Sequence, residues 1–449
     1  MGKNRGRMAD PRSAGNGWRR ALRRRLRDGD ATVAVLGLGY VGLPLLVHLR
    51  RAGFSVVGVD IDPERVASLR EGRSYVTDVP DEALDEPGPP LRFHSALREA
   101  PAYDVVVICV PTPLTNQEPD LGSIEAAAEA VAGTLRPGSL VILESTTYPG
   151  TTEEVLAPIL ERGSGMTAGR DFALAFSPER IDPGREPEHL AKTPKVVGGL
   201  TRSCAALAST FYSSFVYEVT TVSTPREAEM AKLIENSFRH VNIALINEFA
   251  MLSQDLGVDI WEAVQAASSK PFGFMPFWPG PGVGGHCIAI DPAYLSWSVA
   301  QQVGHRVTFV EYAQTVNARM PAYVARRIAE ALNERGLPIK GARILALGVS
   351  YKPDVGDIRE SPALHVLRRL KKAGARISYH DPYVPTFRLN GRVRRSTRLT
   401  PKTLRDHDVT LILTAHSAID FEEVVDHAPL VFDARGVTRG LHRGNLIRL

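Results

Sequence analysis

The chain has 449 residues, 44% hydrophobic and 23% charged, which is enough length and apolar content for two or three globular domains. It lacks any run of eighteen apolar residues, which excludes a transmembrane helix. Its three widely spaced cysteines argue against a disulfide or zinc framework, and we predict no metal site and a reducing, cytoplasmic location.

The formal net charge of +4 is unevenly distributed. Residues 1–30 hold ten basic and three acidic residues, which leaves an acidic remainder. An acidic body with a basic arm is not typical of a nucleic-acid-binding domain, so we predict neither nucleic-acid nor membrane partners. We expect the arm to be a disordered extension, without the apolar segment of a signal peptide.

The stretch ATVAVLGLGYVGLPLLVHLRRAGFSVVGVDID predicts a buried strand, a tight turn, a helix and a second strand that ends at Asp60, expected to be exposed. Gly37, Gly39 and Gly42 form a G-x-G-x-x-G turn, which lets a pyrophosphate approach the backbone. Asp60 has the spacing of the acid that holds the adenosine ribose, and its charge would repel a 2′-phosphate. The pattern therefore predicts NAD; Arg65 either argues for NADP or stacks on the adenine.

Three further apolar stretches, YDVVVICVPTP, GSLVILESTTYPGTT and FALAFSPERIDPG, continue the parallel sheet. In open α/β sheets, ligands bind beyond the carboxyl ends of the strands. The polar residues at these ends are therefore predicted to lie on a functional edge, although any one of them is also compatible with a plain turn: Thr112, Ser145, Thr146, Glu179 and Arg180.

A long helix is predicted next, because Thr224 and Glu227 form a capping box, Pro225 takes the first helical position and Gly257 ends the pattern. We assign its apolar residues to one buried face: Met230, Leu233, Ile234, Phe238, Val241, Leu245 and Leu252. A polar stripe lies opposite and is either a solvated face or, as its few charges favour, a ligand-facing surface: Lys232, Asn236, Arg239 and Asn247.

The loop GFMPFWPGPGVGGHCIAIDPAYL is rich in glycine and proline and presents Cys287. We expect Asp291 to cap the following helix and Pro292 to take its first position, which places Cys287 just ahead of a helix N-terminus. The helix dipole there lowers a thiol pKa and favours a nucleophile. A small buried cysteine beside an ordinary cap is the alternative, and the local sequence leaves both open.

A second long helix, from about residue 305 to 335, leads into another alternation of strands and helices with one turn glycine, Gly348. Basic and polar residues at its strand ends suit a pyrophosphate: Lys352, Asp357, Arg359 and Arg435. We therefore predict an α/β fold with two Rossmann-like parallel-sheet domains joined by a helical middle domain with a long central helix. The predicted boundaries are 1–30 for the extension, 31–220, 221–320 and 321–449.

From about Val33 to Arg435 the chain resembles the UDP-glucose/GDP-mannose dehydrogenase family of nucleotide-sugar 6-dehydrogenases. The matching segments are GLGYVG, CVPTP, ESTTYPG, SPERIDPG, AEMAKLIENSFRHVNIALINE, PGPGVGGHCIAIDP, GVSYKPDVGDIRESPA, YHDP and FDARG. The resemblance implies NAD in the N-terminal domain, a UDP-sugar bound between the other two, and a homodimer or higher oligomer paired through the helical domain.

Carried over by residue, the resemblance implies that Cys287 is the nucleophile, that Lys232, Asn236 and Asp291 surround the reacting C6, and that Thr146 and Glu179 place a water. The predicted cofactor-binding residues are Gly37, Gly39, Tyr40, Val41, Gly42, Asp60, Arg65, Thr112 and Thr146. The predicted substrate-binding residues are Glu179, Arg180, Lys232, Asn236, Arg239, Gly284, Lys352 and Arg359.

Two differences from the family pattern bear on the sugar. UDP-glucose dehydrogenases usually have a lysine where this chain has Ile290, and His286 precedes the cysteine, a form similar to dehydrogenases of UDP-N-acetylhexosamines. Ala289 and His240 depart from that group as well. The expected order of substrates is UDP-N-acetylglucosamine, its galacto or manno epimers, then UDP-glucose. A two-electron hydroxyacid-type dehydrogenase with a structural cysteine and a non-catalytic NAD-binding protein remain the alternatives.

Overall fold

The computed structural model describes residues 11–449 except 77, 116–117 and 181–190; the side chains of residues 11–16, 286, 287 and 289 also lie outside the described part. The chain divides into two compact units, Met1–Ile234 and Glu235–Leu449. The boundary falls inside the long helix α9, Pro225–Asp255, and not at the ends of the predicted helical domain. The two compact units therefore do not test the predicted domain boundaries.

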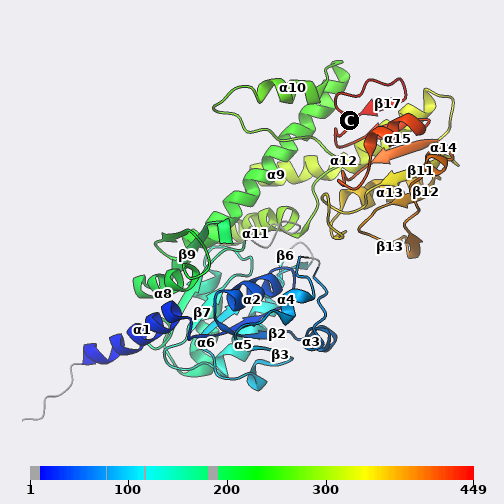
Figure 1. The fold of residues 1–449 in the computed structure, drawn as a ribbon. Helices are drawn as coiled ribbons and strands as arrows, with labels where there is room; N and C mark the ends of the chain where they lie inside the picture. The colour runs from blue at the N-terminus through cyan, green and yellow to red at the C-terminus, as the bar shows by residue number, and fades with distance from the viewer. Residues whose placement is uncertain (1–10, 77, 116–117, 181–190) are drawn as a thin grey trace, which may run out of the picture. The chain divides into compact units, whose positions relative to one another are not determined.

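An eight-stranded sheet forms the centre of the first unit, in the order β10-β9-β8-β7-β4-β1-β2-β3 (Figure 1). All neighbouring strands pair in parallel except β8 and β9, which are antiparallel. The strands are β1 (Thr32–Leu36), β2 (Ser55–Val59), β3 (Leu91–His94), β4 (Val105–Ile108), β7 (Leu140–Leu143), β8 (Ala173–Phe176), β9 (Lys195–Gly199) and β10 (Val219–Val222). The predicted first parallel sheet is confirmed.

Helices cover both faces of this sheet because successive strand residues point to opposite sides. Val33 and Val35 pack with one set of helices, α1 (Pro11–Asp28), α2 (Gly42–Arg51), α3 (Pro63–Arg70) and α8 (Arg202–Tyr212). Ala34 and Leu36 pack with the other set, α5 (Gly122–Ala132) and α6 (Ala157–Ser164). Continuous apolar strands such as Val105–Ile108 follow directly from burial on both faces.

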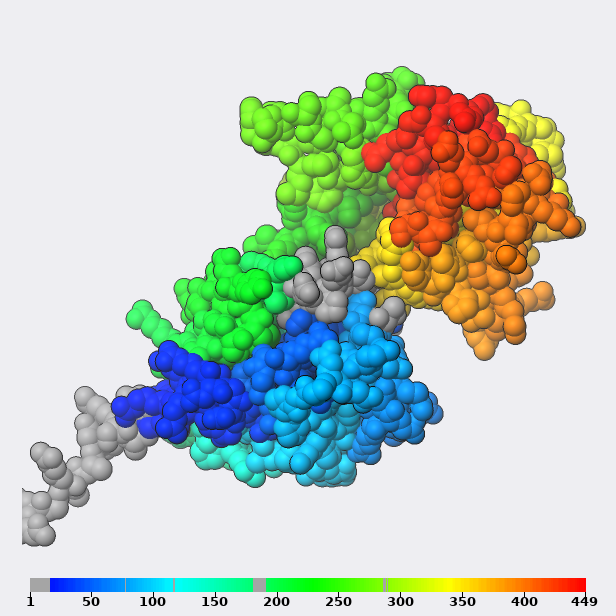
Figure 2. All heavy atoms as spheres, viewed as in Figure 1, coloured from blue at the N-terminus to red at the C-terminus, as the bar shows by residue number. Residues whose placement is uncertain are grey.

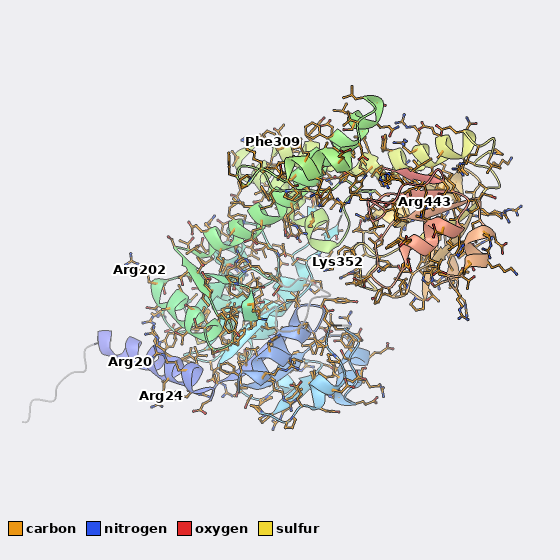
Figure 3. All side chains as sticks on the ribbon, turned by 45° about the horizontal axis from the view of Figure 1, so that its top comes forward. Arg20, Arg24, Arg202, Phe309, Lys352 and Arg443 are labelled. Carbon is orange, nitrogen blue, oxygen red and sulfur yellow. The ribbon has the colours of Figure 1, made fainter. Side chains whose placement is uncertain are left out.

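Helix α1 corrects the prediction of a disordered N-terminal extension. Residues 11–28 are helical, and Leu22 and Leu26 are buried in the core that α1 shares with α8. The four-residue spacing of Trp18, Leu22 and Leu26 gives α1 an apolar stripe that the dense arginines concealed. The atoms of α1 lie against those of the α8 segment in Figure 2, and Arg20 and Arg24 are on its outer side in Figure 3. Residues 1–10 lie outside the described part.

A five-stranded parallel sheet lies in the second unit, in the order β12-β11-β15-β16-β17. Its strands are β11 (Arg343–Leu347), β12 (Arg376–His380), β15 (Val409–Ile412), β16 (Val431–Asp433) and β17 (Leu446–Arg448). One face packs on α10 (Ile260–Ala267), α12 (Thr308–Asn333) and α13 (Pro362–Lys372), the other on α14 (Pro401–Arg405) and α15 (Phe421–His427). The predicted second parallel sheet and the helices between the two sheets are confirmed.

Helix α9 begins and ends as predicted. The Thr224 backbone N–H donates to Glu227, and Gly257 follows the helix with φ of 68°. Its two predicted faces, however, are largely exchanged, although Leu233 is buried as predicted and Arg239 is exposed. Ile234, Phe238, Leu245 and Leu252 are exposed, whereas the polar Lys232, Asn236 and Asn247 are buried. Periodicity locates the two stripes of a helix but does not decide which one the fold covers.

Candidate active site

The glycine turn between β1 and α2 has the geometry that a bound dinucleotide requires. Gly37 has φ of 88°, and a Cβ there would lie 2.7 Å from the Cys109 carbonyl oxygen. A Cβ on Gly42 would meet the Gly37 carbonyl oxygen at 1.9 Å, whereas one on Gly39 would meet nothing within 4 Å. Two of the glycines thus close the turn, and the third leaves space above it. Helix α2 starts here without a side-chain cap, and Tyr40 and Val41 directly precede its first residue, Gly42.

Asp60 follows β2 and is buried, not exposed as predicted, with 7% of its surface accessible. Its carboxylate accepts hydrogen bonds from the backbone N–H of Leu38 at 2.9 Å and of Asp62 at 3.0 Å. The acid therefore also fixes the glycine turn. Arg65 lies 3.6 Å from Asp60 and over the ring of Tyr75, so its guanidinium is engaged within the protein.

The strand-end residues predicted for the functional edge are mostly buried. Thr112 follows β4 and is 3% exposed. Ser145 follows β7 and donates to the Val110 carbonyl oxygen at 2.8 Å, which ties two neighbouring strand ends together. Thr146 is half-buried next to it. Arg180 donates to the Pro194 carbonyl oxygen at 2.7 Å, which holds the segment after β8.

A buried ionic cluster lies at the same strand ends and was not predicted. The ammonium group of Lys195, at the start of β9, is 3.1 Å from Glu144 and 3.6 Å from Glu179. Tyr212 of α8 donates to the Glu144 carboxylate. A signal was present in the sequence, since a glutamate directly follows the apolar run LVIL and a lysine precedes VVGG. Buried charges of this kind need partners, which only the fold identifies.

Helix α9 carries two of the predicted catalytic residues one turn apart. In the first unit, the Lys232 ammonium group donates to the Glu179 carbonyl oxygen. In the second unit, the Asn236 side chain donates to the Asp291 carboxylate, which is 1% exposed. The structure therefore joins Lys232 to Glu179 and Asn236 to Asp291. Arg239, in contrast, is exposed on α9.

Asp291 and Pro292 lie inside helix α11, His286–Val303, which corrects their predicted cap and first positions. The helix begins earlier because Gly285, with φ of 84°, turns the chain, its N–H donating to the Arg359 carbonyl oxygen at 3.3 Å. Cys287 consequently belongs to the first helical turn and does not precede it. Its side chain and that of His286 lie outside the described part.

Two glycines of this loop pack tightly on the second sheet domain. A Cβ on Gly284 would lie 2.8 Å from the Glu360 carbonyl oxygen, and one on Gly280 would lie 2.8 Å from a guanidinium nitrogen of Arg435. Arg359 is exposed and forms an ion pair with Asp357 at 2.6 Å. Lys352 is half-buried on the segment after β11 and is labelled in Figure 3. The structure thus brings the Gly284 loop and Arg359 together.

Asn247 of the predicted polar stripe holds this loop from the other side. Its side-chain oxygen accepts the Gly280 N–H at 2.9 Å, and its amide nitrogen donates to Asn317 of α12 at 2.9 Å. Asn317 in turn donates to the His240 carbonyl oxygen at 3.2 Å. Asn247 therefore acts inside the protein and not on a ligand-facing surface.

Among the described residues, no helix is long and apolar enough to cross a membrane, and no group of His, Cys, Asp and Glu is arranged to hold a metal ion. The acceptor and donor groups described above instead suit an organic anion with a polar reacting centre.

Three family models match the chain in succession. They are the NAD binding domain of the UDP-glucose/GDP-mannose dehydrogenase family over residues 31–216, its central domain over 226–319 and its UDP binding domain over 345–440. The NAD binding match covers the glycine turn and the buried cluster, and the central match covers α9 and the Cys287 loop.

Named relatives agree with these matches. A UDP-N-acetyl-D-glucosamine 6-dehydrogenase of Pseudomonas aeruginosa is 38% identical over 79% of this chain and 83% of its own length. A UDP-N-acetyl-D-mannosamine dehydrogenase of Pyrococcus horikoshii is 35% identical over 91% of this chain and 99% of its own length. The solved structure of the UDP-D-ManNAc dehydrogenase from Pyrococcus horikoshii superposes with a TM-score of 0.83 at 33% identity, covering 93% of this chain and 98% of that one.

Proposed function

Since this chain belongs to the UDP-glucose/GDP-mannose dehydrogenase family and is an NAD-dependent dehydrogenase, we propose that it oxidises C6 of a UDP-N-acetylhexosamine to the uronic acid. UDP-N-acetylglucosamine is the first candidate, and its manno epimer is the second. The observation that carries the proposal is the buried hydrogen bond from Asn236 of α9 to Asp291 of α11, the helix that also contains Cys287.

The position of this pair suits alcohol oxidation. Cys287 and Asp291 are four residues apart on α11, the spacing that puts two positions on one face of a helix. Asp291 then serves as the base that takes the C6 hydroxyl proton through a water, while Asn236 holds the carboxylate in place. Lys232 stabilises negative charge on the C6 oxygen.

A thiol is needed because a primary alcohol reaches the carboxylate only by losing two hydrides. The Cys287 thiolate adds to the intermediate aldehyde, and the hemithioacetal loses the second hydride to give a thioester. Water then cleaves the thioester, with Thr146 and Glu179 orienting it. The first-turn position of Cys287 in α11 supports this role, since the backbone N–H groups of that turn favour a thiolate.

NAD would supply the oxidant, with each of the two hydrides going to a separate NAD molecule bound in turn. Gly37, Gly39 and Gly42 would let its pyrophosphate approach the backbone, and the space above Gly39 fits that approach. Asp60 would hold the ribose hydroxyls and disfavour the 2′-phosphate of NADP. Thr112 and Thr146, at neighbouring strand ends, complete the proposed cofactor-binding residues.

The uridine diphosphate is assigned to basic groups of the second sheet domain. Lys352 and Arg359 lie on the segment after β11, where the Gly284 loop packs. Arg435 follows β16, and burial lowers the pKa of its guanidinium to about 10, so that it stays protonated at neutral pH. Arg180, on the first unit, and Arg239 are proposed as further contacts with the substrate.

Ile290 and His286, on either side of the cysteine, are the reason for proposing a substrate that carries an acetamido group. His240 fits an uncharged sugar-binding region, because burial lowers its pKa and keeps the imidazole neutral at pH 7. A pocket built for an acetamido group leaves its polar partners unpaired when only a hydroxyl is present. We therefore expect UDP-N-acetylhexosamines to have a kcat/KM at least about tenfold above that of UDP-glucose.

The test is an NADH-formation assay over UDP-N-acetylglucosamine, UDP-N-acetylmannosamine, UDP-N-acetylgalactosamine and UDP-glucose, with the mass of each product. The proposal requires two NADH per sugar and a uronic acid. One NADH per sugar would indicate a two-electron dehydrogenase, and equal or better use of UDP-glucose would reject the acetamido assignment.

A homodimer is proposed from the exposed apolar face of α9. Leu245, Phe249, Leu252 and Leu256 follow each other at helical spacing, and each is at least 47% exposed. Phe309, at the start of α12, also projects at the surface (Figure 3). Light scattering should give a dimer mass, and Leu252→Glu should give a monomer, whereas Arg443→Glu on another surface should not.

We also propose a cytoplasmic location, because Cys109 and Cys204 are free thiols.

A further inference from the structure

Four ionisable side chains of the first unit are buried together behind the strand ends. They are Glu144 after β7, Glu179 after β8, Lys195 at the start of β9 and Tyr212 of α8, and none is more than 9% exposed. Lys195 contacts both carboxyl groups and also donates to the Pro178 carbonyl oxygen at 3.3 Å. The proposed base for thioester hydrolysis, Glu179, is therefore part of an ionic cluster.

The ammonium group of Lys195 is shared by the two carboxyl groups of this cluster. Lys195 supplies one positive charge, and its pKa is raised because the two carboxylates outweigh the effect of burial. Burial raises the pKa of Tyr212 and of the neighbouring Cys109, so both stay neutral. Lys232 is bonded to the Glu179 backbone. Two carboxylates held against one ammonium group repel each other, and a single proton on the carboxyl pair removes this repulsion.

The hydrogen bonds of Glu144 also require a proton. Its Oε1 accepts from Tyr212, and its buried Oε2 has no donor among the described residues. Glu144 and Glu179 both contact Lys195, and a hydrogen bond between their side chains, which contributes to the raised pKa of Glu144, requires a proton because an ionised carboxylate has no donor. Burial raises the pKa of Glu144 to about 7, with Lys195 lowering it and Glu179 raising it. The pair therefore gains and loses this proton around neutral pH.

We propose that Glu144 and Glu179 share one proton and that Glu144 is the positioning residue that sets the orientation and basicity of Glu179. The proposal rests on the function given above, in which Glu179 acts on the hydrolytic water. With the proton on Glu144, the carboxyl group donates to Glu179 and holds it as an oriented carboxylate. Once the pair loses that proton, Glu179 lies next to an anion and becomes a stronger base.

The assisted step is hydrolysis without any change of oxidation state. Water adds to the thioester carbonyl carbon as one of its protons passes to Glu179. The carbon–sulfur bond then breaks, and the electron pair leaves with the Cys287 sulfur as a thiolate. The new carboxylic acid ionises. The protons on Glu179 and on the product return to solvent, or one of them reprotonates the thiolate.

The experiment is a single-turnover reaction of the full-length protein with NAD and UDP-N-acetylglucosamine between pH 5.5 and 9. The decay of the acyl-enzyme is followed by the mass of the intact protein after quenching. We expect the hydrolysis rate to rise with pH through an apparent pKa near 7, which is the titration of the pair. In Glu144→Gln, whose amide donates to Glu179 at every pH, this dependence should vanish.

Glu229→Gln is the matched control. Glu229 is also buried in the first unit, and burial raises its pKa to about 7, but its carboxylate accepts from Gly150 and Thr152. The control should keep the pH dependence of the parental protein. Lys195→Met removes the only cation on the pair among the described residues and should move the apparent pKa upward by at least one pH unit.

Infrared spectroscopy of protonated carboxyl groups gives a readout that does not need activity. In a Glu229→Gln background, which removes the other buried carboxyl group with a pKa of about 7, the protein should lose such a band near pH 7, and this band should be absent after Glu144→Gln and shifted to lower pH after Glu179→Gln. Unchanged titration in both variants, or an unchanged pH dependence of hydrolysis in Glu144→Gln, would overturn the shared proton. If the parental protein gives no uronic acid from any UDP-sugar, the proposed function fails instead, while the infrared result still decides the pairing.

Discussion

Asn247→Ala should destabilise the second unit more than an alanine substitution of any exposed residue on α9. The side chain is fully buried and makes two hydrogen bonds, to the Gly280 N–H and to Asn317. Alanine leaves both partners unpaired, and at about 1–3 kcal/mol for each buried unsatisfied group the expected loss is about 2–6 kcal/mol. Gly280 cannot easily move to another partner, because Arg435 packs directly against it.

The free energy of unfolding of the second unit is measured by denaturant titration with tryptophan fluorescence. Trp261 and Trp278 are stacked in this unit at 5.8 Å and report its unfolding. Asn242→Ala is the matched control, since the Asn242 amide only donates to the Phe238 carbonyl oxygen on the exposed side of the same helix. The control should change stability by no more than about 0.5 kcal/mol.

A double-mutant cycle with Asn317→Ala tests the network itself. The two asparagines share a hydrogen bond, so the second substitution should cost less than it does alone, with a coupling of about 0.5–3 kcal/mol. Equal effects of Asn247→Ala and Asn242→Ala, or strictly additive single changes, would refute the claim that Asn247 fixes the loop leading to Cys287.

Three further outcomes are expected. Asp60→Asn should raise the KM for NAD at least about tenfold while retaining an acceptor for the Leu38 N–H, and equal turnover with NADP in the parental protein would contradict the role of Asp60. Leu26→Ala should cost about 2–4 kcal/mol in the first unit, whereas the exposed Arg24→Ala should cost almost nothing; equal thermal midpoints would mean that α1 is not part of the core. Cys287→Ala should bind NAD and UDP-sugar yet form no uronic acid, and conversion of added aldehyde to acid at the parental rate would exclude the covalent mechanism.

Local patterns in the sequence predicted those parts of the fold that local physics determines. The glycine turn depends on backbone conformations near Gly37, and the start of α9 depends on the capping box of Thr224 and Glu227. The interactions that form both features lie close together in the sequence. The spacing between Gly37 and Asp60 predicted a ribose-binding acid, whereas the bond from the Leu38 N–H to Asp60 was not predicted.

Burial was harder to predict, because it depends on what the rest of the chain places against a surface. Leu245 and Leu252 of α9 are exposed, whereas Asn247 is buried because it meets Asn317 of a helix seventy residues away. In α1 the sequence analysis missed a buried surface, because arginines that extend into solvent concealed the buried stripe of Leu22 and Leu26. Periodicity describes the helix, whereas burial is a property of the whole unit.

Asp291 shows how a sound local rule is overridden. Aspartate followed by proline is a strong signal for a helix start, yet α11 begins six residues earlier, where Gly285 is fixed by its contacts with Tyr351 and Arg359. The earlier start has a chemical consequence. It moves Asp291 from the helix end to the face that meets Asn236, and it moves Cys287 from a loop into the first turn, where free backbone N–H groups favour its thiolate form. The tertiary contacts of Gly285 thus determine the positions of both the proposed base and the proposed nucleophile.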